Sequence, residues 1–197
     1  MSEPRQRIKH IPVVVADVIQ ETADTVTLLL DAGGDPRDYK AGQYVSIAPH
    51  QFAAIAGYTS FLEDAKGRKE PPRAYSMCST PEEPYLAITV KEETYARGQT
   101  KYPPLLSPFL VHHPLKGKTM EVTGYAGGYH LPERVAERTD HIVHLCAGSG
   151  SVPNVSIIKW ALDHEPTVRH TFIYSNKTWN DIIYRDLLTA LEAKHPD

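Results

Sequence analysis

Cysteine is scarce in this chain: only Cys78 and Cys146 occur among its 197 residues. The two lie in neither a C-x-x-C redox motif nor the paired spacing of a structural zinc site. An iron–sulfur cluster takes about four cysteine ligands, so this chain alone cannot hold one. Because free cysteines are usually buried, we expect both thiols to lie in the core and not to act as nucleophiles.

Long apolar runs and an excess of positive charge are also missing. The longest apolar stretch, residues 11–19, contains Pro12 and Asp17 and is too short to cross a bilayer. The first ten residues lack the apolar core of a secretory signal. A formal net charge of −3 gives no long-range attraction to nucleic acid or to anionic lipid. We therefore expect a cytoplasmic protein that binds neither nucleic acid nor a membrane.

Ten histidines are present, but their spacing does not predict a metal site. His141 and His144 have opposite parity along an expected strand, so their side chains should point to opposite faces. His112 and His113 are neighbours at an expected helix end. We predict that the chain binds no metal.

The first two thirds of the chain consist of short β-rich runs separated by turn residues. The clearest run is 86–91, where Leu86, Ile88 and Val90 alternate with smaller or polar residues and can line one buried face. Further strands are expected at 13–19, 25–30, 44–47, 74–79 and 120–123. This pattern is typical of a small antiparallel barrel or sandwich. We expect a short helix around 102–110, where adjacent prolines tolerate a first helical turn, and a solvated loop over the charged segment 63–70.

After the polar stretch 131–140 the pattern changes to strand, helix, strand, helix. Strands are expected at 142–146 and 169–174, with an apolar helical stripe over 155–162 between them. A final helix should carry Ile183, Leu187 and Leu191 on one face, with Thr178 as its N-cap. This βαβα order opens a doubly wound nucleotide-binding sheet. We therefore predict two domains, 1–136 and 137–197, the second of them incomplete because two strands are few for such a sheet.

Two short motifs carry chemistry. Arg73-Ala74-Tyr75-Ser76 offers a guanidinium fork for phosphate, an aromatic face for a flat heterocycle and a hydroxyl for a ring nitrogen. On a regular strand Arg73 and Tyr75 share one face and Ser76 lies on the other, so the backbone must bend if all three touch one ligand. Without further context, the same four residues would be ordinary strand surface.

The second motif is a glycine turn, Gly148-Ser149-Gly150, between an expected strand and an expected helix. Free amides at a helix N-terminus suit an anionic group, and glycine permits close approach of a dinucleotide. The turn lacks the Lys-Ser/Thr pair of a phosphate loop, which disfavours ATP hydrolysis. A simple tight connection between strand and helix is the alternative.

The order of these motifs resembles that of the ferredoxin-NADP reductase superfamily over nearly the whole chain. Members of that family resemble this chain in having Arg-x-Tyr-Ser on a flavin-binding barrel, then a pyrophosphate-binding serine, then Gly-Thr/Ser-Gly-x-x-Pro at the start of a nicotinamide domain. Residues 41–45 and 124–129 are similar to two further family segments. The resemblance implies a six-stranded antiparallel Greek-key flavin barrel followed by a partial doubly wound βαβα domain.

The resemblance also assigns roles to individual residues. It places Arg73 at a flavin phosphate, and it makes Tyr75 and Ser76 the catalytic pair beside the isoalloxazine ring, with Ser76 at the N5 edge. The remaining flavin-binding residues that it implies are Thr89, Val90, Lys91 and Ser107, of which Ser107 matches the pyrophosphate serine. On the nicotinamide side the implied residues are Gly148, Ser149, Gly150 and Pro153, together with Ser175 and Lys177 near the adenosine ribose or its 2'-phosphate.

The function implied by the resemblance is electron transfer from NADPH or NADH, through bound FAD, to an iron–sulfur acceptor protein or domain. FMN is the less favoured flavin. Two departures from the family pattern stand out: Pro103-Pro104 replaces a Gly-Gly pair, and a later Cys-Gly-Pro segment is absent. We therefore expect a fragment of a longer reductase. The alternatives are a flavin-binding or interaction module without turnover, and a reductase that uses free flavin as substrate.

Overall fold

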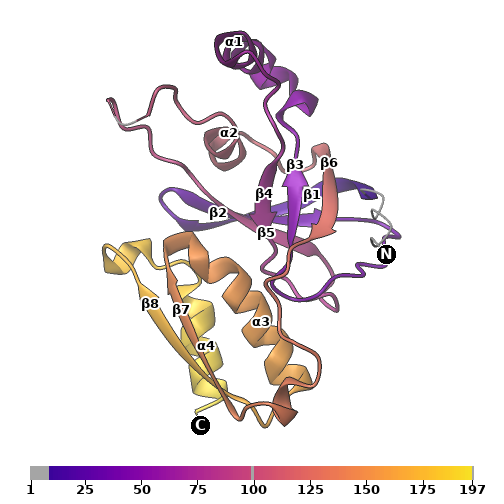
Figure 1. The fold of residues 1–197 in the computed structure, drawn as a ribbon, viewed down its shortest axis with the longest axis vertical. Coiled ribbons are helices and arrows are strands. Elements are labelled where there is room, and N and C mark those ends of the chain that lie inside the picture. Colours follow the sequence, from indigo (N-terminus) through magenta and orange to yellow (C-terminus); the bar gives the residue numbers. More distant parts are fainter. Residues whose placement is uncertain (1–8, 99, 197) are drawn as a thin grey trace, which may run out of the picture.

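The computed structural model describes residues 9–98 and 100–196. Six antiparallel strands form one sheet, in the spatial order β4-β3-β6-β1-β2-β5 (Figure 1). The strands are β1 (Lys9–Thr22), β2 (Thr25–Asp31), β3 (Tyr44–Ile47), β4 (Arg73–Ser76), β5 (Leu86–Lys91) and β6 (Thr119–Ala126). The predicted antiparallel all-β first part is confirmed, and β3 and β5 have the predicted bounds.

The two edges of this sheet meet each other. Just beyond β4, Met77 forms an antiparallel bridge with Ile88 of β5, and the main-chain N–H of Cys78 donates to the carbonyl of Ala87 at 2.9 Å. The sheet therefore curls around one core, in which Leu86, Ile88 and Val90 are fully buried. The apolar face predicted for β5 is the inner face.

A helical segment separates β3 from β4. It contains the 3₁₀ turns η1 (Pro49–Gln51) and η2 (Ala53–Ile55) and the helix α1 (Ala56–Lys66), which projects away from the sheet (Figure 1). The loop expected over residues 63–70 was therefore wrong for its first part, which forms the last turn of α1. The helix ends where Gly67 adopts a left-handed φ of +64°, a conformation that glycine takes at little cost.

The helix expected around 102–110 begins later than the prolines. It is α2 (Leu106–His112), which packs against β5. Pro103 and Pro104 precede it, outside any helix or strand. Within the described ranges, no helix is both long and apolar enough to cross a membrane.

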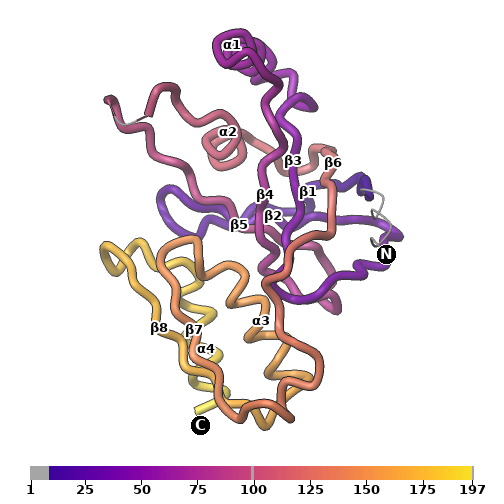
Figure 2. The backbone as a smooth tube through the Cα atoms, in the orientation of Figure 1, coloured from indigo at the N-terminus to yellow at the C-terminus, as the bar shows by residue number. Residues whose placement is uncertain are grey.

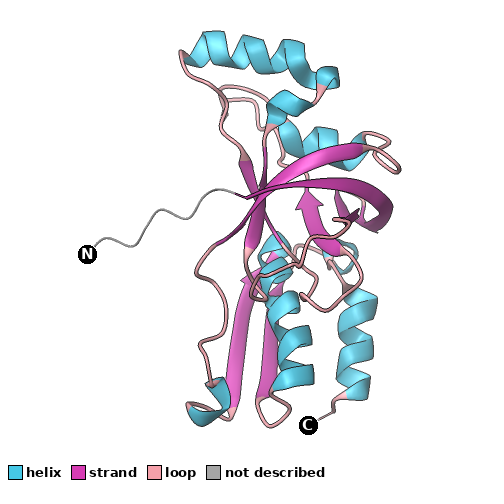
Figure 3. Ribbon diagram, turned by 90° about the vertical axis from the view of Figure 1, so that its right-hand side faces the viewer, coloured by secondary structure: helices cyan, strands magenta, loops and turns pink. Residues whose placement is uncertain are grey.

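The second part is the predicted βαβα unit. Strands β7 (His141–Ala147) and β8 (Arg169–Ser175) are parallel, and the helices α3 (Ser151–His164) and α4 (Arg185–Lys194) both cover one face of the pair (Figure 3). On the other face Val143, Leu145 and Ile173 are more than half exposed. His141 is exposed and His144 is buried, as their parity predicted.

The start of the last helix differs from the prediction. Thr178 caps the 3₁₀ turn η5 (Trp179–Asp181), with which it forms a capping box through Asp181, and α4 begins only at Arg185. Ile183 is fully buried just before the helix, and Tyr184 takes a φ of +60°. Burial of these two residues between the turn and the helix explains why one continuous helix does not form.

The two parts pack directly on each other, with η3 (Val135–Glu137) in the segment that connects them. Figure 2 shows β5 above the second part, on the side opposite the C-terminus, although nearly a hundred residues separate β5 from α4. A shared apolar cluster joins them, consisting of Cys78, Ala87, Val152, Val155, Ile183 and Tyr184. Lys159 of α3 also pairs with Glu83 at 2.5 Å.

Candidate functional site

Arg73 begins β4, and its side chain is 39% exposed. One guanidinium nitrogen, Nη2, donates to Oε2 of Glu70 at 2.9 Å. The other, Nη1, makes only a long 3.5 Å contact with the carbonyl of Pro71. Because a guanidinium carries five N–H donors, Arg73 keeps donors for an anion that approaches from solvent.

Tyr75 and Ser76 follow on the same strand, paired with Val45 and Tyr44 of β3. Burial raises the pKa of the Tyr75 hydroxyl, which therefore remains protonated at neutral pH. The Ser76 hydroxyl has no hydrogen-bond partner among the residues that the structure describes. Immediately afterwards Met77 turns to pair with β5, so regular strand geometry ends at Ser76, where the sequence required a bend.

The three predicted residues of β5 use their side chains within the fold. Val90 is fully buried in the core, and Lys91 Nζ donates to Asp24 at 2.6 Å. The Thr89 hydroxyl contacts the hydroxyls of Thr27, at 2.7 Å, and Tyr184. A ligand beside residues 89–91 would therefore have to contact their main chain.

Ser107 lies in the first turn of α2 and is buried. Its Oγ accepts a hydrogen bond from the main-chain N–H of Glu93 at 3.0 Å. Ser107 thus fixes the segment after β5 against α2. Glu93 also faces the Tyr75 hydroxyl closely enough for its charge to contribute to the raised pKa of that tyrosine.

The glycine turn connects β7 to α3 as a 3₁₀ turn, η4 (Gly148–Gly150). Its first carbonyl, that of Gly148, accepts hydrogen bonds from the hydroxyls of Ser151 and Tyr174, both at 2.9 Å. Gly148 has a φ of +48°, and a Cβ there would meet nothing within 4 Å. Hydrogen bonds to its first carbonyl thus hold the turn in place, and the space beside the α-carbon of Gly148 is open.

The predicted nicotinamide residues gather at the carboxyl ends of the two parallel strands. Ala147 pairs with Ser175 across the sheet, so the turn that contains Ser149 and the segment that leads to Lys177 leave the same edge. Pro153 follows in the first turn of α3. Ligands of open α/β sheets bind at this edge, which makes it the candidate dinucleotide site.

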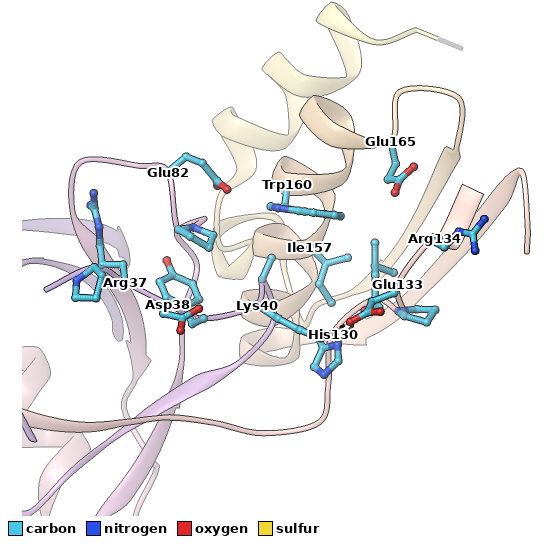
Figure 4. Close-up of a pocket in the computed structure, with 16 residues that line it drawn as sticks. Arg37, Asp38, Lys40, Glu82, His130, Glu133, Arg134, Ile157, Trp160 and Glu165 are labelled. Atoms are coloured by element: carbon cyan, nitrogen blue, oxygen red, sulfur yellow. Dashed lines mark hydrogen bonds and ion pairs between the residues drawn. The ribbon is translucent and has the colours of Figure 1, made fainter. Parts of the chain in front are cut away.

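A separate cavity of about 610 Å³ lies on the linker side of the molecule, between segments 36–41 and 130–134 and helix α3. Trp160 and Ile157 point into it from α3 (Figure 4). Two of the charged residues at its rim form an ion pair, in which Lys40 Nζ lies 3.7 Å from Glu133 Oε1. The cavity is lined by none of the residues predicted to bind flavin or nicotinamide, and the candidate site lies elsewhere.

The two cysteines differ in burial. Cys78 is buried, as predicted, whereas Cys146 is only half-buried. Desolvation nevertheless raises the pKa of Cys146 to about 11, and burial also raises the pKa of Cys78. Because the thiolate is the reactive form, neither residue is poised to act as a nucleophile at neutral pH.

The similar proteins match both parts of the chain. Residues 145–197 match the model of the oxidoreductase NAD-binding domain family. The 1,2-phenylacetyl-CoA epoxidase of Escherichia coli (strain K12) has a component that is 27% identical over 185 residues, which are 92% of this chain and 45% of that component. The ferredoxin reductase component of the 3-ketosteroid-9-alpha-monooxygenase of Mycobacterium tuberculosis is 30% identical over 187 residues, covering 93% and 46%.

Among solved structures, the ferredoxin-NADP+ reductase from Plasmodium falciparum has the same fold, with a TM-score of 0.74 at 17% sequence identity over 95% of this chain and 66% of that one. The chain belongs to the ferredoxin-NADP reductase superfamily. It spans about half the length of the curated relatives it matches.

In this member of the ferredoxin-NADP reductase superfamily, a buried polar network holds the glycine turn, and the sequence did not point to it. Asn154 Nδ2 donates to the carbonyl of Gly150 at 2.8 Å. Its Oδ1 accepts from the Tyr129 hydroxyl at 2.8 Å and from His144 Nδ1 at 2.9 Å. His144 Nε2 then accepts from His170 Nδ1 at 2.9 Å. The sequence offered one signal for this network: Asn154 is a polar residue in the first turn of the helix that follows the glycine turn.

Both histidines of this network remain neutral. Burial lowers the pKa of His144. Burial, together with the neighbouring His144 and His141, lowers the pKa of His170 to about 4. Neutral rings can each donate one hydrogen bond and accept another, so the network runs in one direction from His170 to Gly150.

Gly42 is the second residue that sequence reasoning undervalued in this reductase fold. Its main-chain N–H donates to Ser156 Oγ of α3 at 3.3 Å, and the same Oγ donates to the carbonyl of Ser79 at 2.7 Å. The glycine therefore lies where the six-stranded sheet touches the second part. It belongs to the segment 41–45 that is similar to a family motif, but contact with α3 has no local sequence signal.

Proposed function

We propose that this chain is the flavin- and nicotinamide-binding part of an NAD(P)H-dependent reductase that passes electrons to an iron–sulfur protein or domain. One observation carries the proposal: Cys78, which follows the Arg73–Ser76 strand, and Val152, which follows the Gly148–Gly150 turn, are buried in one shared apolar cluster. The names of two similar proteins support an iron–sulfur acceptor. One is a ferredoxin reductase component, and the other is a phthalate dioxygenase reductase described as transferring electrons from pyridine nucleotides to [2Fe-2S].

The residues of β4 fit a flavin. Arg73 has guanidinium donors directed at solvent for a phosphate, and Ser76 has a hydroxyl without a partner among the described residues. We assign residues 1–136 to a flavin-binding barrel and residues 137–197 to the nicotinamide domain, with FAD favoured over FMN. A bound flavin would supply the chemistry of accepting a hydride and releasing single electrons.

The chain itself positions the two cofactors. Arg73 would hold the phosphate, Tyr75 would lie along the flavin, and Ser76 would donate to the N5 edge. A Cβ at Gly148 would meet nothing within 4 Å, which would leave room there for the nicotinamide, with Ser149 beside its carboxamide. Ser175 and Lys177 would lie near the adenosine ribose. Holding two reactants in contact accounts for much of the acceleration such enzymes achieve.

The decisive experiment is reconstitution of the purified chain with FAD, followed by single-turnover reduction with NADPH and with NADH. We expect retained flavin absorbance that bleaches on addition of one of the two donors. Retained flavin without bleaching would instead indicate a binding module, and release of reduced flavin would indicate a free-flavin reductase. Failure to bind any flavin would reject the proposal.

Arg73→Ala should weaken flavin binding. Removing a charge-assisted phosphate contact costs about 1.5 to 3 kcal/mol, which corresponds to a rise in Kd of roughly 10- to 150-fold. Fluorescence titration of the apoprotein with FAD measures this directly. Arg68→Ala, an exposed arginine a few residues earlier, is the matched control. An unchanged Kd for Arg73→Ala would remove Arg73 from the site.

Ser76→Ala should retain flavin but reduce it more slowly. One neutral hydrogen bond to the N5 edge is worth about 0.5 to 1.5 kcal/mol, so we expect a rate lower by roughly 2- to 13-fold. Stopped-flow absorbance after mixing with NAD(P)H gives the rate. Ser60→Ala, on the exposed side of α1, should leave the rate unchanged. Native reduction kinetics in Ser76→Ala would contradict its assignment.

A further inference from the structure

The helical segment between β3 and β4 returns to the candidate flavin site at its end. Helix α1 points away from the sheet (Figures 1 and 2), but its last residue, Lys66, is linked to Arg73 through a single carboxylate. Lys66 Nζ is 2.6 Å from Glu70 Oε1, and Arg73 Nη2 is 2.9 Å from Glu70 Oε2. Glu70 thus holds two cations side by side at the start of β4.

The three side chains differ in exposure. Glu70 is 1% exposed, whereas Lys66 is 25% and Arg73 is 39% exposed. Burial opposes ionisation of Glu70, but hydrogen bonds and charge from Lys66 and Arg73 outweigh it and lower the pKa of this carboxyl. Lys66, Glu70 and Arg73 therefore carry a net positive charge between them, and the two cations are more exposed than the carboxylate. A second carboxylate, that of Glu63, accepts from the main-chain N–H of Glu70 at 2.9 Å and is paired with His50.

Two consecutive residues of the neighbouring loop have no main-chain donor for an anion. Pro103 and Pro104 have no main-chain N–H. Helix α1 packs against this loop, since the Tyr58 hydroxyl donates to the carbonyl of Pro103 at 2.8 Å and Lys66 Nζ lies 5.5 Å from the centre of the Tyr102 ring. Lys66 thus places its ammonium, held by Glu70, next to two residues that supply no main-chain donor.

We propose that Lys66 is a second phosphate-binding cation beside Arg73, and that the pair selects FAD, with two linked phosphates, over FMN, with one. This inference rests on the proposed flavin-binding function. Arg73 alone satisfies a single phosphate, because its fork can make two parallel hydrogen bonds to one group. A second phosphate needs a second donor, and Lys66 is held within reach of Arg73 by their shared carboxylate. A lysine is suited to this role because its ammonium is a flexible point charge.

Lys66→Met tests the proposal, because methionine keeps most of the apolar stem and removes the charge. We expect the Kd for FAD, from fluorescence titration of the apoprotein, to rise about tenfold or more, as for loss of a charge-assisted hydrogen bond. The Kd for FMN should stay close to that of the native chain. The salt dependence of FAD binding should also decrease, since one fewer exposed charge contributes to it.

Two further variants make the result specific. Lys69→Met removes an exposed lysine from the same segment and should change neither Kd, whereas Lys66→Arg should restore FAD binding. An unchanged Kd for FAD in Lys66→Met, equal losses for FAD and FMN, or a native chain without preference for FAD would overturn the inference. A native chain that binds neither flavin would instead reject the proposed function. Melting temperatures of all variants report whether each is folded.

Discussion

Gly42→Ala is expected to unfold far more easily than the native chain. A Cβ at this position would lie 2.3 Å from the main-chain oxygen of Tyr129 and 2.8 Å from Cδ1 of Ile157. The φ of +97° is also a conformation that residues with side chains rarely adopt. Backbone strain of about 1 to 3 kcal/mol and overpacking of about 1 to 3 kcal/mol act together. We expect the free energy of unfolding to fall by about 3 kcal/mol or more, measured by urea denaturation.

Gly57→Ala is the matched control for this loss. Gly57 lies in α1, and a Cβ there would meet nothing within 4 Å. Alanine is favoured over glycine in helices by up to about 1 kcal/mol, so this variant should be as stable as the native chain or slightly more stable. If Gly42→Ala were as stable as Gly57→Ala, the close approach of Gly42 to Tyr129 and Ile157 would not exist in solution.

The consequence of Gly42→Ala should extend to function. Gly42 and Ser79 are both tied to Ser156 of α3, so a side chain at Gly42 would push α3 away from the six-stranded sheet. The proposed flavin and nicotinamide sites lie on opposite sides of that interface. Under the proposed function, any folded Gly42→Ala protein should reduce its flavin more slowly than the native chain, because small displacements of reacting groups are costly.

Strands with a regular pattern were predictable from the sequence. β5 alternates apolar residues with smaller ones, and its apolar residues form the inner face. The change from an all-β pattern to βαβα was also visible, because an apolar helical stripe follows a buried strand and a glycine turn. Both signals depend only on residues close in sequence, where backbone geometry fixes which side chains share a face.

Helix α1 was not predictable because its apolar pattern is weak. Only Thr59 and Leu62 are buried in it, so the helix has no continuous apolar stripe to distinguish it from a charged loop. The start of α4 was misplaced for a different reason. Thr178 and Asp181 do form a capping box, but burial of Ile183 and Tyr184 ends the turn early. Tertiary packing overrode a correct local signal.

The candidate site, too, was only partly predictable from the sequence. The two motifs predicted Arg73 and Gly148 as binding residues, because their chemistry is contained in a few consecutive residues. Their partners come from elsewhere in the fold: the Thr89 hydroxyl is engaged by Thr27 and Tyr184. No local pattern encodes such long-range contacts. The sequence thus identified which residues were chemically suited to a ligand, but not which of them the fold had already occupied.

Asn154→Leu is expected to destabilise the chain by about 2 to 3 kcal/mol and to impair the nicotinamide site. Leucine fills a similar volume but removes all three hydrogen bonds of the Asn154 amide. Tyr129 is exposed and can bond to water, whereas His144 is buried and would be left with an unpaired N–H. A buried donor without a partner costs about 1 to 3 kcal/mol. Urea denaturation at pH 7.5, well above the ordinary histidine pKa of about 6.5, measures the loss.

The functional effect of Asn154→Leu should be confined to one cofactor. Because Asn154 holds the carbonyl of Gly150, its loss should raise the KM for NAD(P)H while the Kd for FAD stays unchanged. Tyr129→Phe removes only the exposed hydroxyl of the network and should cost less than about 1 kcal/mol, as for an ordinary solvent-exposed hydrogen bond. If FAD binding weakened in Asn154→Leu as much as the KM for NAD(P)H rose, the network would support the whole interface and not the glycine turn in particular. Equal stability of Asn154→Leu and Tyr129→Phe would show that the bond between His144 and Asn154 contributes little, and the turn would then depend on Ser151 and Tyr174 alone.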